Sequence, residues 1–555
     1  MNTKTMKIFY KALCCCCVAG LLTACTDFLE ESPNDRVDDE NAIRTVSDLY
    51  LNAVAARYAD VGGNANSQGL QGTGRGVYDL NTFTTDEAII PTRGTDWYDG
   101  HLWQDLFQHK FAGLDPIGDT WNYLMKAIMG CNGSLEQIDK FAQKHPEANL
   151  DAYRAEVRGL RAMFYFYAID LYGRVPLFTS SSPSAADLKL KNRSEAIKHV
   201  VGELQQVVPQ LAEERSNQAG TYYGRFTRPV AYFLLAKVFL NSEVYCDDDW
   251  TDGSRPDGKA IKWTVDGATM NAWEACVHYC NLITEMGYSL EDVYETNFLV
   301  HNEVSGENIF TIPMDKYLYR NQYCYLFRSR HYNHAAALGL NGENGPCATL
   351  DALRVFGLAE GDIDGSDPEV DPRFVKTYYS GQVYDLNNNK VLLDDGTPLV
   401  YEPWAVALDV SNTPYEKTAG ARMKKYEVDP NGTKDGNQSD NDIVLFRYAD
   451  VLLMQCEAML RNGQAGAEAD MLLELVRGRV GAMTRSATLE NVLDERMLEL
   501  AWEGWRRNDM IRFNIYGSAY KMHSPSEADV RGYTTVFPIP GEILSLSGSA
   551  QNPGY

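Results

Sequence analysis

Two helical patterns that lie close together in the sequence constrain the fold of this chain more than any other feature. In NDIVLFRYADVLLMQCEAMLRNG, residues 441–463, apolar side chains recur at helical spacing at Val444, Tyr448, Val451, Leu452 and Cys456. In VLDERMLELAWEGWRRNDMIRF, residues 492–513, they recur at Val492, Leu493, Met497, Leu500, Ala501, Gly504 and Trp505. Neither helix can bury its apolar face alone, so we expect the two to pack together and against further helices.

Length and composition allow several architectures but narrow the range of partners. With 555 residues the chain can hold two to four domains or one large helical array. A hydrophobic content of 45% and a charged content of 23% are ordinary for a soluble globular protein. The formal net charge of −25 predicts an acidic surface, which argues against binding to nucleic acid or to anionic lipid.

The N-terminus carries the pattern of an export signal. Lys4, Lys7 and Lys11 precede an apolar run at 12–22, which is too short to cross a membrane. The run ends at Leu22-Thr23-Ala24-Cys25, which looks like a lipobox, in which the cysteine is lipidated and becomes the first residue after cleavage. We therefore predict a lipoprotein signal peptide at 1–24 and a lipidated tether at 25–41; a secretory peptide cut elsewhere is the alternative. No later stretch reaches the ~20 apolar residues of a membrane span.

Both helical patterns closely resemble the signature of the SusD/RagB family of surface-exposed nutrient-binding lipoproteins of the Bacteroidetes outer membrane. In that family an R-Y-A-[DE]-V-L-L-M...E-A segment precedes an E-R...E-L...E-G-x-R...D-x-x-R segment. This sequence matches at Arg447, Tyr448, Ala449, Asp450, Glu457, Ala458, Glu495, Arg496, Glu499, Leu500, Glu503, Gly504, Arg506, Asp509 and Arg512. Trp505 departs from the pattern, because the family more often has histidine there. Shorter matches, from TDFLEESP after Cys25 to the terminal QNPGY, extend the resemblance over the whole mature chain.

The resemblance implies a mainly α fold, with a tetratricopeptide-like scaffold of helix pairs and an inserted, loop-rich lobe that faces the ligand. Strong helical periodicity at 155–171 and further helical patterns at 194–211, 228–241 and 272–286 agree with such a scaffold. Between 315 and 425, Gly, Asn, Asp and Pro cluster, and short strand-like runs appear at 390–393 and 398–401. We therefore predict a helical scaffold with N-terminal ligand loops at 42–314, the loop-rich lobe at 315–425, and a helical scaffold with a C-terminal segment at 426–555.

The most suggestive surface segment is TTDEAIIPTRGTDWYDGHLWQDLFQH, residues 84–109. Proline and glycine interrupt any helix there, which leaves four candidate ligand-binding side chains on a loop: Arg93, Trp97, Tyr98 and Asp99. An exposed tryptophan can offer a flat apolar face to a sugar ring, while a carboxylate and a guanidinium bind its hydroxyls. The competing interpretation is that Trp97 anchors the loop from beneath.

Other candidate ligand residues are weaker. Asp79 lies near a glycine-rich stretch at 69–76, which is expected to be a surface loop close to ligand rather than a phosphate cradle. In the lobe we consider Tyr317 with Tyr325, and Trp404 with Arg422; burial under the lobe is the alternative for both pairs.

Carboxylates spaced four residues apart raise the question of catalysis. An isolated row of Glu495, Glu499 and Glu503 would repel itself, so nearby arginines predict an ion-pair network; they are Arg477, Arg479, Arg496, Arg506, Arg507 and Arg512. A retaining glycosidase pair would also fit a spacing of ~6 Å, but no cleft is evident. No His-Glu-x-x-His, Gly-x-Ser-x-Gly or phosphate-loop motif is present. We therefore expect a binding protein rather than an enzyme.

Two stretches were weighed as metal sites. Cys276 and Cys280 lie one helical turn apart, but zinc needs two more ligands, and an odd number of cysteines follows Cys25; buried core thiols are the preferred interpretation. The turn at 362–367 has calcium-like oxygen spacing, yet its glycine is displaced from the EF-hand position and no glutamate follows at position twelve. We expect no cofactor and no metal, with calcium as the alternative.

The resemblance implies a lipoprotein anchored in the outer membrane and facing the cell exterior. It would capture a polysaccharide or oligosaccharide and deliver it to a SusC-like TonB-dependent transporter, over which it would lie as a lid. The alternatives are a peptide-capturing relative and a secreted glycoside hydrolase. The sequence does not name the glycan, because family members bind their cargo with non-homologous loop residues.

Overall fold

The computed structural model describes residues 43–64, 68–72, 75–319, 328–434 and 438–555. The predicted signal peptide, the tether with Cys25, and Tyr325 lie outside the described residues. The described residues up to Asn52 belong to one unit, and those from Ala53 to Tyr555 belong to another. In the first unit, α3 (Val46–Leu49) begins at Thr45, which makes a reciprocal capping box with Asp48.

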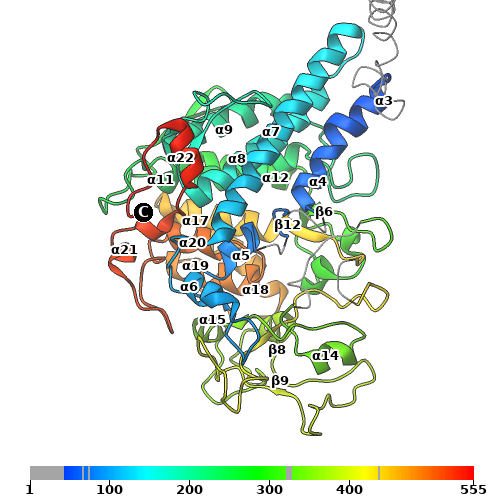
Figure 1. The fold of residues 1–555 in the computed structure, drawn as a ribbon, viewed down its shortest axis with the longest axis vertical. Helices are drawn as coiled ribbons and strands as arrows, with labels where there is room; N and C mark the ends of the chain where they lie inside the picture. The colour runs from blue at the N-terminus through cyan, green and yellow to red at the C-terminus, as the bar shows by residue number, and fades with distance from the viewer. Residues whose placement is uncertain (1–42, 65–67, 73–74, 320–327, 435–437) are drawn as a thin grey trace, which may run out of the picture. The chain divides into compact units, whose positions relative to one another are not determined.

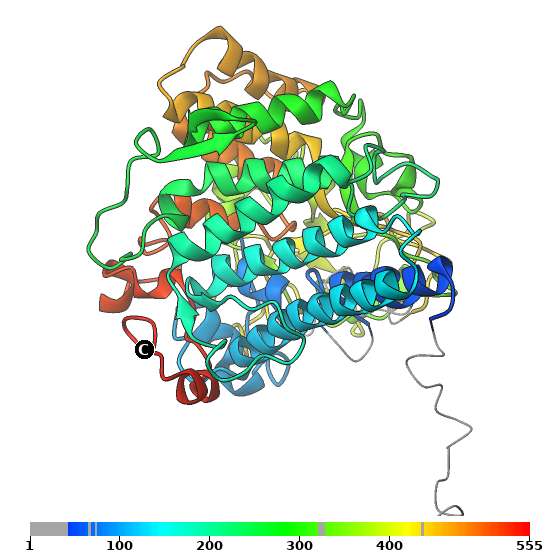
Figure 2. The same cartoon turned by 90° about the horizontal axis from the view of Figure 1, so that it is seen from above.

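Long helices that pack in succession form the scaffold of the larger unit (Figure 1). α7 (Asp115–Lys144) packs on α8 (Asp151–Tyr172), and α8 packs on α9 (Arg193–Val207). α10 (Arg228–Leu240) packs on α12 (Ala272–Glu285), which in turn contacts α17 (Tyr448–Arg461). Figure 2 shows them side by side, from cyan through green to yellow. The mainly helical, tetratricopeptide-like fold is confirmed.

Local sequence explains where these helices begin and end. Gly173, at φ +70°, ends α8, and Pro229 stands in the first turn of α10. Asn271 caps α12 and forms a capping box with Glu274. Gly159 lets α8 approach Phe226 closely, because an added Cβ would lie 2.3 Å from that ring.

The two signature segments differ in detail from the continuous helices that the periodicity predicts. The first begins with a buried strand, β12 (Ile443–Arg447), before α17 starts at Tyr448. The second is divided into α19 (Leu489–Leu500) and α20 (Arg506–Arg512). The break contains Trp502 at φ +65° and Gly504 at φ +75°, a left-handed backbone that no α-helix continues through.

The loop-rich lobe lies between two strands that pair with each other. β6 (Asn308–Ile312) and β12 form a buried antiparallel ladder, so the chain leaves the scaffold at one strand and returns at the other. Inside the lobe, β9 (Gly381–Gln382) pairs with β10 (Val400–Tyr401), over a small core of Val383, Val391, Leu399 and Tyr401. The predicted strand at 390–393 is wrong: its residues make only isolated bridges, at Lys390 and Leu392.

Short elements connect these parts. They are η1 (Tyr50–Ala55), α4 (Ala56–Gly62), α5 (Val77–Thr82), β1 (Ala88–Ile89), η2 (Asp99–His101), α6 (Leu102–Phe107), β2 (Val175–Pro176), β3 (Leu190–Lys191), η3 (Val208–Gln210), α11 (Ser242–Tyr245), β4 (Lys262–Val265), β5 (Ala268–Asn271), η4 (Tyr294–Phe298), η5 (Asn302–Val304), α14 (Tyr332–Ala337), β7 (Cys347–Ala348), α15 (Leu350–Val355), α16 (Phe374–Thr377), β8 (Tyr378–Tyr379), β11 (Arg422–Met423), α18 (Ala467–Arg479), α21 (Glu527–Val530), η6 (Tyr533–Thr535) and α22 (Gly541–Ser547).

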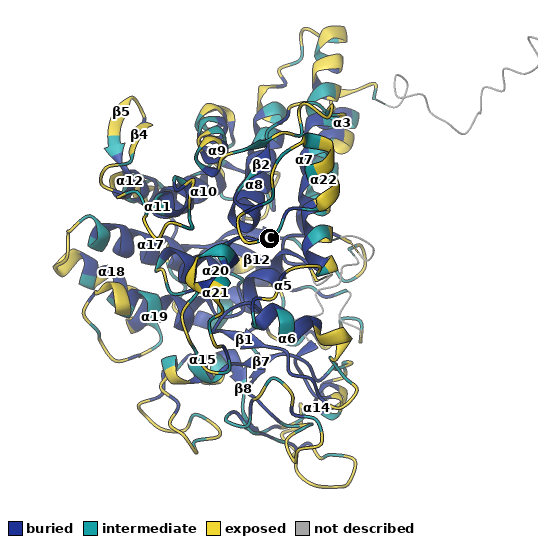
Figure 3. Ribbon diagram, turned by 60° about the vertical axis from the view of Figure 1, so that its left-hand side comes forward, coloured by how far each residue is buried: buried dark blue, intermediate teal, exposed yellow. Residues whose placement is uncertain are grey.

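Buried residues are concentrated in the helical scaffold and in the part of the lobe next to it (Figure 3). Cys276 and Cys280 are fully buried free thiols, as the core interpretation predicts. Among the described helices, none combines the length and apolar character needed to cross a bilayer.

Candidate functional site

The loop at 93–101 is held at both ends by buried elements. Before it, β1 pairs with β7, and Thr92 exchanges backbone hydrogen bonds with the 408–410 segment at 3.0 Å each. The loop turns where Arg93 and Asp96 exchange backbone hydrogen bonds of 2.9 and 3.0 Å. After it, α6 enters the core through Trp103 and Phe107. The side chains between these ends are therefore displayed from a fixed base.

Trp97 is both an anchor and a partly exposed ring. Its indole Nε1–H donates to the Glu343 carbonyl at 2.6 Å, and its ring lies over Gly345, where a Cβ would come within 2.6 Å of it. The Trp103 ring packs edge-to-face against the Trp97 ring, with 5.8 Å between the two ring centroids. The residue nevertheless stays partly exposed. Both interpretations of Trp97 considered from sequence therefore describe part of its environment.

Polar groups of the same loop bond to residues of neighbouring segments. The Asp99 Oδ2 accepts from Arg75 Nη2 at 2.9 Å and from Trp103 Nε1 at 2.7 Å. Tyr332 donates its hydroxyl to Asp96 Oδ2 at 2.7 Å. Tyr98 and Tyr332 are 48% and 46% exposed. We call this group the aromatic loop cluster; its members are Arg75, Asp96, Trp97, Tyr98, Asp99 and Tyr332.

Sequence reasoning identified half of this cluster. Trp97, Tyr98 and Asp99 were candidates, whereas Arg75, Asp96 and Tyr332 were not. Arg75 comes from the glycine-rich stretch that was expected to approach a ligand. Tyr332 begins α14 in the lobe, and no local pattern signals that its hydroxyl reaches a loop 236 residues earlier in the chain.

An open groove continues from this cluster into the lobe. It has a volume of about 510 Å³ and runs from Tyr332 and Asn333 on α14 to Asp385, Leu392 and Asp394. Tyr332 belongs to both the cluster and the groove, so an exposed aromatic ring and the carboxylates of Asp385 and Asp394 line this groove.

Three predicted ligand residues need correction because they are buried. Arg93 is 2% exposed and donates to the carbonyls of Glu416, Gly345 and Ala419, at 3.2, 3.3 and 2.9 Å. Burial, together with the neighbouring Arg422, lowers the pKa of Arg93 to about 9. Both guanidinium groups therefore fix loop backbone instead of facing solvent: Arg422 is fully buried and donates to the Ser329 carbonyl at 2.7 Å.

Asp79 is likewise inside the protein. Its two carboxylate oxygens accept from Arg328 Nη1 at 3.2 Å each, and the residue is fully buried. Burial raises the pKa of Asp79 despite this partner. It supports the loops from below and is not available to a ligand.

The other candidates lie apart on the lobe. Tyr317 is 81% exposed, on a turn closed by the Asp315 side chain, which accepts from the Tyr317 and Leu318 amides. Trp404 is partly buried, and its Nε1–H donates to the Asp362 carbonyl at 3.0 Å. The Asp362 carboxylate accepts from the amides of Asp364 and Gly365, so it closes the acidic turn on itself.

The glutamate row lies in a buried ion-pair network, as the sequence predicts, but two of the six predicted arginines, Arg477 and Arg479, pair with it in the described structure. The other four pair with different carboxylates: Arg496 with Asp450 and Asp509, Arg506 with Asp86, Arg507 with Asp170, and Arg512 with Glu457 and Asp509. Glu495, Glu499 and Glu503 are at most 3% exposed, and their partners include Arg373, Lys425, Arg447, Arg477 and Arg479. Burial alone would raise the pKa of Glu499, but the surrounding arginines hold it well below its usual range. Carboxylates buried and paired in this way cannot act as the acid and base of a glycosidase.

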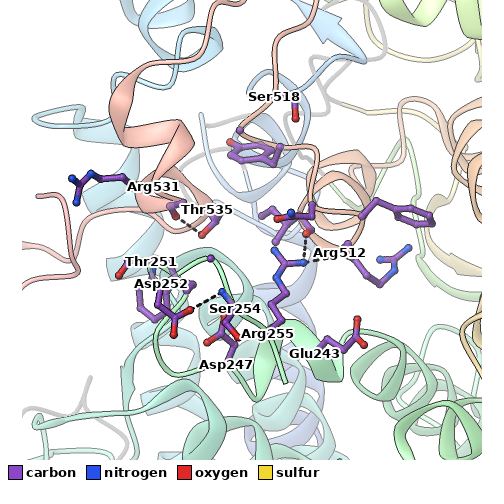
Figure 4. Close-up of a pocket in the computed structure, with 18 of the residues that line it drawn as sticks. Glu243, Asp247, Thr251, Asp252, Ser254, Arg255, Arg512, Ser518, Arg531 and Thr535 are labelled. Atoms are coloured by element: carbon purple, nitrogen blue, oxygen red, sulfur yellow. Dashed lines mark hydrogen bonds between the residues drawn. The ribbon is translucent and has the colours of Figure 1, made fainter. Parts of the chain in front are cut away.

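Another cavity, with a volume of about 870 Å³, lies elsewhere in the described structure (Figure 4). Its walls come from α11, the 250–255 loop, α20 and the 514–535 segment. Charges of both signs face it, among them Asp247, Asp252, Arg255 and Arg531. None of its lining residues belongs to the aromatic loop cluster.

Comparison with known proteins shows which protein family this chain resembles. The model of the SusD family matches residues 307–555, and a second model, described as "Starch-binding associating with outer membrane", matches residues 27–240. The starch-binding protein SusD of Bacteroides thetaiotaomicron is 23% identical over the full length of both chains. SusD-like protein P25 of Formosa agariphila is 25% identical over 96% of this chain and 97% of its own.

Solved structures agree in fold. A laminarin binding SusD-like protein superposes with a TM-score of 0.64 at 20% identity, over 92% of this chain and 100% of its own. A surface glycan-binding protein A from Bacteroides thetaiotaomicron, solved with laminarihexaose, gives 0.64 at 19% identity over the same shares. The signature residues, the helical scaffold with its inserted lobe, and the two family matches lead to one conclusion: the chain belongs to the SusD family.

Proposed function

We propose that this chain is a cell-surface lipoprotein that captures a polysaccharide or oligosaccharide at the aromatic loop cluster and delivers it to a TonB-dependent outer-membrane transporter. The observation that carries the proposal is the gathering of three solvent-accessible aromatic side chains, Trp97, Tyr98 and Tyr332, with two carboxylates and a guanidinium on fixed loops. Association with the outer membrane follows from the family itself.

The chemistry of the cluster suits a neutral sugar. Aromatic faces stack on the apolar C–H faces of pyranose rings, and Asp96, Asp99 and Arg75 offer acceptors and donors for hydroxyl groups. Their bonds to Tyr332 and Trp103 hold the carboxylates in place before ligand arrives. A preorganised surface of this kind loses little conformational entropy on binding.

The relatives support glycan cargo. Their names describe a starch-binding protein, a laminarin binding protein and a complex with laminarihexaose. The family consists of binding proteins, and the chain is not an enzyme. The Leu22–Cys25 lipobox supports lipid anchoring on the outer face.

Binding is tested by affinity electrophoresis and calorimetry over a panel of polysaccharides, with four proteins compared. Tyr98→Ala removes an exposed ring that contacts only His101 among the ring contacts of the structure, so its folding should be intact. Trp97→Ala removes the larger ring, and Tyr317→Ala removes a more exposed ring outside the cluster. We expect one glycan to bind the unaltered protein without release of reducing sugar, and both cluster variants to bind it on the order of tenfold more weakly.

The outcomes separate the alternatives. Loss of binding only in Tyr317→Ala would move the site to the 315–318 turn and contradict the aromatic loop cluster. If the protein binds no glycan of the panel but binds peptides, the result would favour a peptide-capturing relative. Delivery to the transporter is tested separately, by co-purification of the tagged protein with a TonB-dependent transporter from its own outer membrane. If no such transporter co-purifies, the result would contradict the transport step.

A further inference from the structure

A second group of chemically active side chains lies in the core below the C-terminal segment. It consists of His109, His523 and Asp529, all buried, with potential ligand atoms within 4.8 Å of one another. His109 follows α6, His523 closes the turn that begins at Tyr520, and Asp529 belongs to α21. Residues more than 400 positions apart thus meet at one point.

In each imidazole, the ring nitrogen that faces away from Asp529 already has a hydrogen-bond partner. His109 Nε2 lies 2.9 Å from the Thr84 carbonyl, and His523 Nδ1 lies 3.1 Å from the Phe107 carbonyl. A carbonyl oxygen can only accept, so both of these nitrogens carry hydrogen. The remaining nitrogens, His109 Nδ1 and His523 Nε2, point toward Asp529, at 2.7 Å from Oδ1 and 3.9 Å from Oδ2.

One nitrogen on the inner side of the cluster has no hydrogen-bond partner among the described residues. A proton can bridge His109 Nδ1 and Asp529, but His523 Nε2 has no hydrogen-bond partner in the described part of the chain. A buried polar nitrogen that has no hydrogen-bond partner costs free energy, and a cation between this nitrogen and the Asp529 carboxylate would remove that cost.

We propose that His109 Nδ1, His523 Nε2 and Asp529 bind one divalent transition-metal ion, Zn²⁺. Two imidazoles and a carboxylate are a ligand set that zinc prefers, with water in the fourth position. Imidazole ligands of zinc normally donate their other N–H to a carbonyl or carboxylate, and both histidines do so here.

The spacing is close to that required. Bonds of about 2.0–2.1 Å in a tetrahedron place ligand atoms roughly 3.3 Å apart. The observed separations of 2.7 and 3.9 Å lie on either side of this value, and all three potential ligand atoms lie within 4.8 Å of one another, so small side-chain shifts would form the site. Asp529 is also among the residues that line the 870 Å³ cavity, although its side chain is fully buried. A water molecule would supply the fourth ligand.

Bound zinc would join the segment after α6 to the C-terminal segment. α6 follows directly on the loop that carries Trp97 and Tyr98. The ion would therefore stabilise the base of the loop without touching the glycan, and the site is independent of the proposed binding function.

The experiment measures zinc in the whole protein. The protein is unfolded with a chelator, refolded with equimolar Zn²⁺, passed through gel filtration and analysed by mass spectrometry for metal. We expect about one zinc per chain, with X-ray absorption showing nitrogen and oxygen but no sulfur ligands. His523→Gln should lower the zinc content at least about tenfold while circular dichroism stays unchanged.

The matched control is His278→Gln, a partly exposed histidine that pairs with Asp266 on the surface, and it should retain the zinc. Should His523→Gln fail to fold, Co²⁺ substitution of the unaltered protein decides: the visible spectrum of a tetrahedral nitrogen and oxygen site supports the proposal, and its absence contradicts it. A refolded protein without zinc, equal zinc in His523→Gln, or sulfur ligation would each overturn it.

Discussion

Glu87 connects the ligand-loop region to the signature helices, and its ionisation should limit the stability of the protein. The residue is 1% exposed, and its Oε1 accepts from the Trp502 amide at 2.9 Å, in the break between α19 and α20. Burial raises the pKa of Glu87 to about 7, and the Trp502 N–H and the cations of Arg506 and Lys425 only partly oppose this. The carboxyl is therefore largely protonated in the folded protein at pH 5 and ionised at pH 8.

The sign and size of the effect follow from linkage. Between the unfolded pKa of 4.5 and the folded value near 7, the folded state binds more protons, so stability falls as pH rises through this window. For this one group the loss between pH 5 and pH 8 is about 2–3 kcal/mol. Glu87→Gln keeps an acceptor for the Trp502 amide and removes the charge. The variant should match the unaltered protein within about 1 kcal/mol at pH 5 and exceed it by about 2–3 kcal/mol at pH 8.

The assay is urea unfolding at pH 5, 6, 7 and 8, followed by tryptophan fluorescence. The difference between variant and unaltered protein is read at each pH, because other carboxylates contribute equally to both proteins. Glu542→Gln, at an exposed position on α22, is the control and should show no such trend. A difference that does not change with pH, or a variant less stable at pH 8, would refute the reasoning.

Three further predictions concern the network, the helix break and the anchor. Arg447→Met leaves Glu499 and Glu503 buried without a shared partner and should lower the free energy of unfolding by about 3–5 kcal/mol. The control, Arg531→Met, breaks an exposed pair with Glu527 and should lower it by less than about 1 kcal/mol. Equal urea midpoints for the two variants would contradict this. Gly504 has φ +75°, and no atom would lie nearer than 3.4 Å to an added Cβ, so Gly504→Ala should destabilise the protein by about 1–2 kcal/mol through backbone strain alone. Gly478→Ala, inside α18, should instead stabilise the protein by about 0.5–1 kcal/mol. A change of the same sign in both variants would exclude strain as the cause. Cys25→Ser should abolish labelling by a fatty-acid analogue and release the protein from the detergent phase, and a labelled Cys25→Ser protein would disprove the predicted lipid site.

The scaffold was predictable because its determinants are local. Helical periodicity, the Gly173 stop and the spacing of the signature motif are all read within a few residues. The division of the second signature segment was not, because it depends on the Trp502 amide reaching Glu87, 415 residues earlier in the chain. The paired strands β6 and β12 were missed for the same reason: an apolar run of five residues identifies its partner only in the folded chain.

The aromatic loop cluster was predictable only in part. Trp97, Tyr98 and Asp99 follow from a polar loop interrupted by proline and glycine. The sequence does not distinguish an arginine that faces solvent from one that binds backbone carbonyls. Arg93 is of the second kind, and the carbonyls it binds come from Gly345 and Ala419, more than 250 residues away.

The buried ionic network gives these loops a rigid base. Arg373 and Lys425 come from the inserted lobe, whereas Glu499 and Glu503 come from the C-terminal scaffold, and Arg447 stands where the lobe rejoins it. Every ion pair among them therefore crosses or lies at the junction. Movement of the lobe on the scaffold would separate buried charges, which costs several kcal/mol for each pair left unpaired. The family signature thus encodes a fixed junction, and this leaves the surface loops free to differ between relatives with different cargo while the scaffold beneath them stays the same.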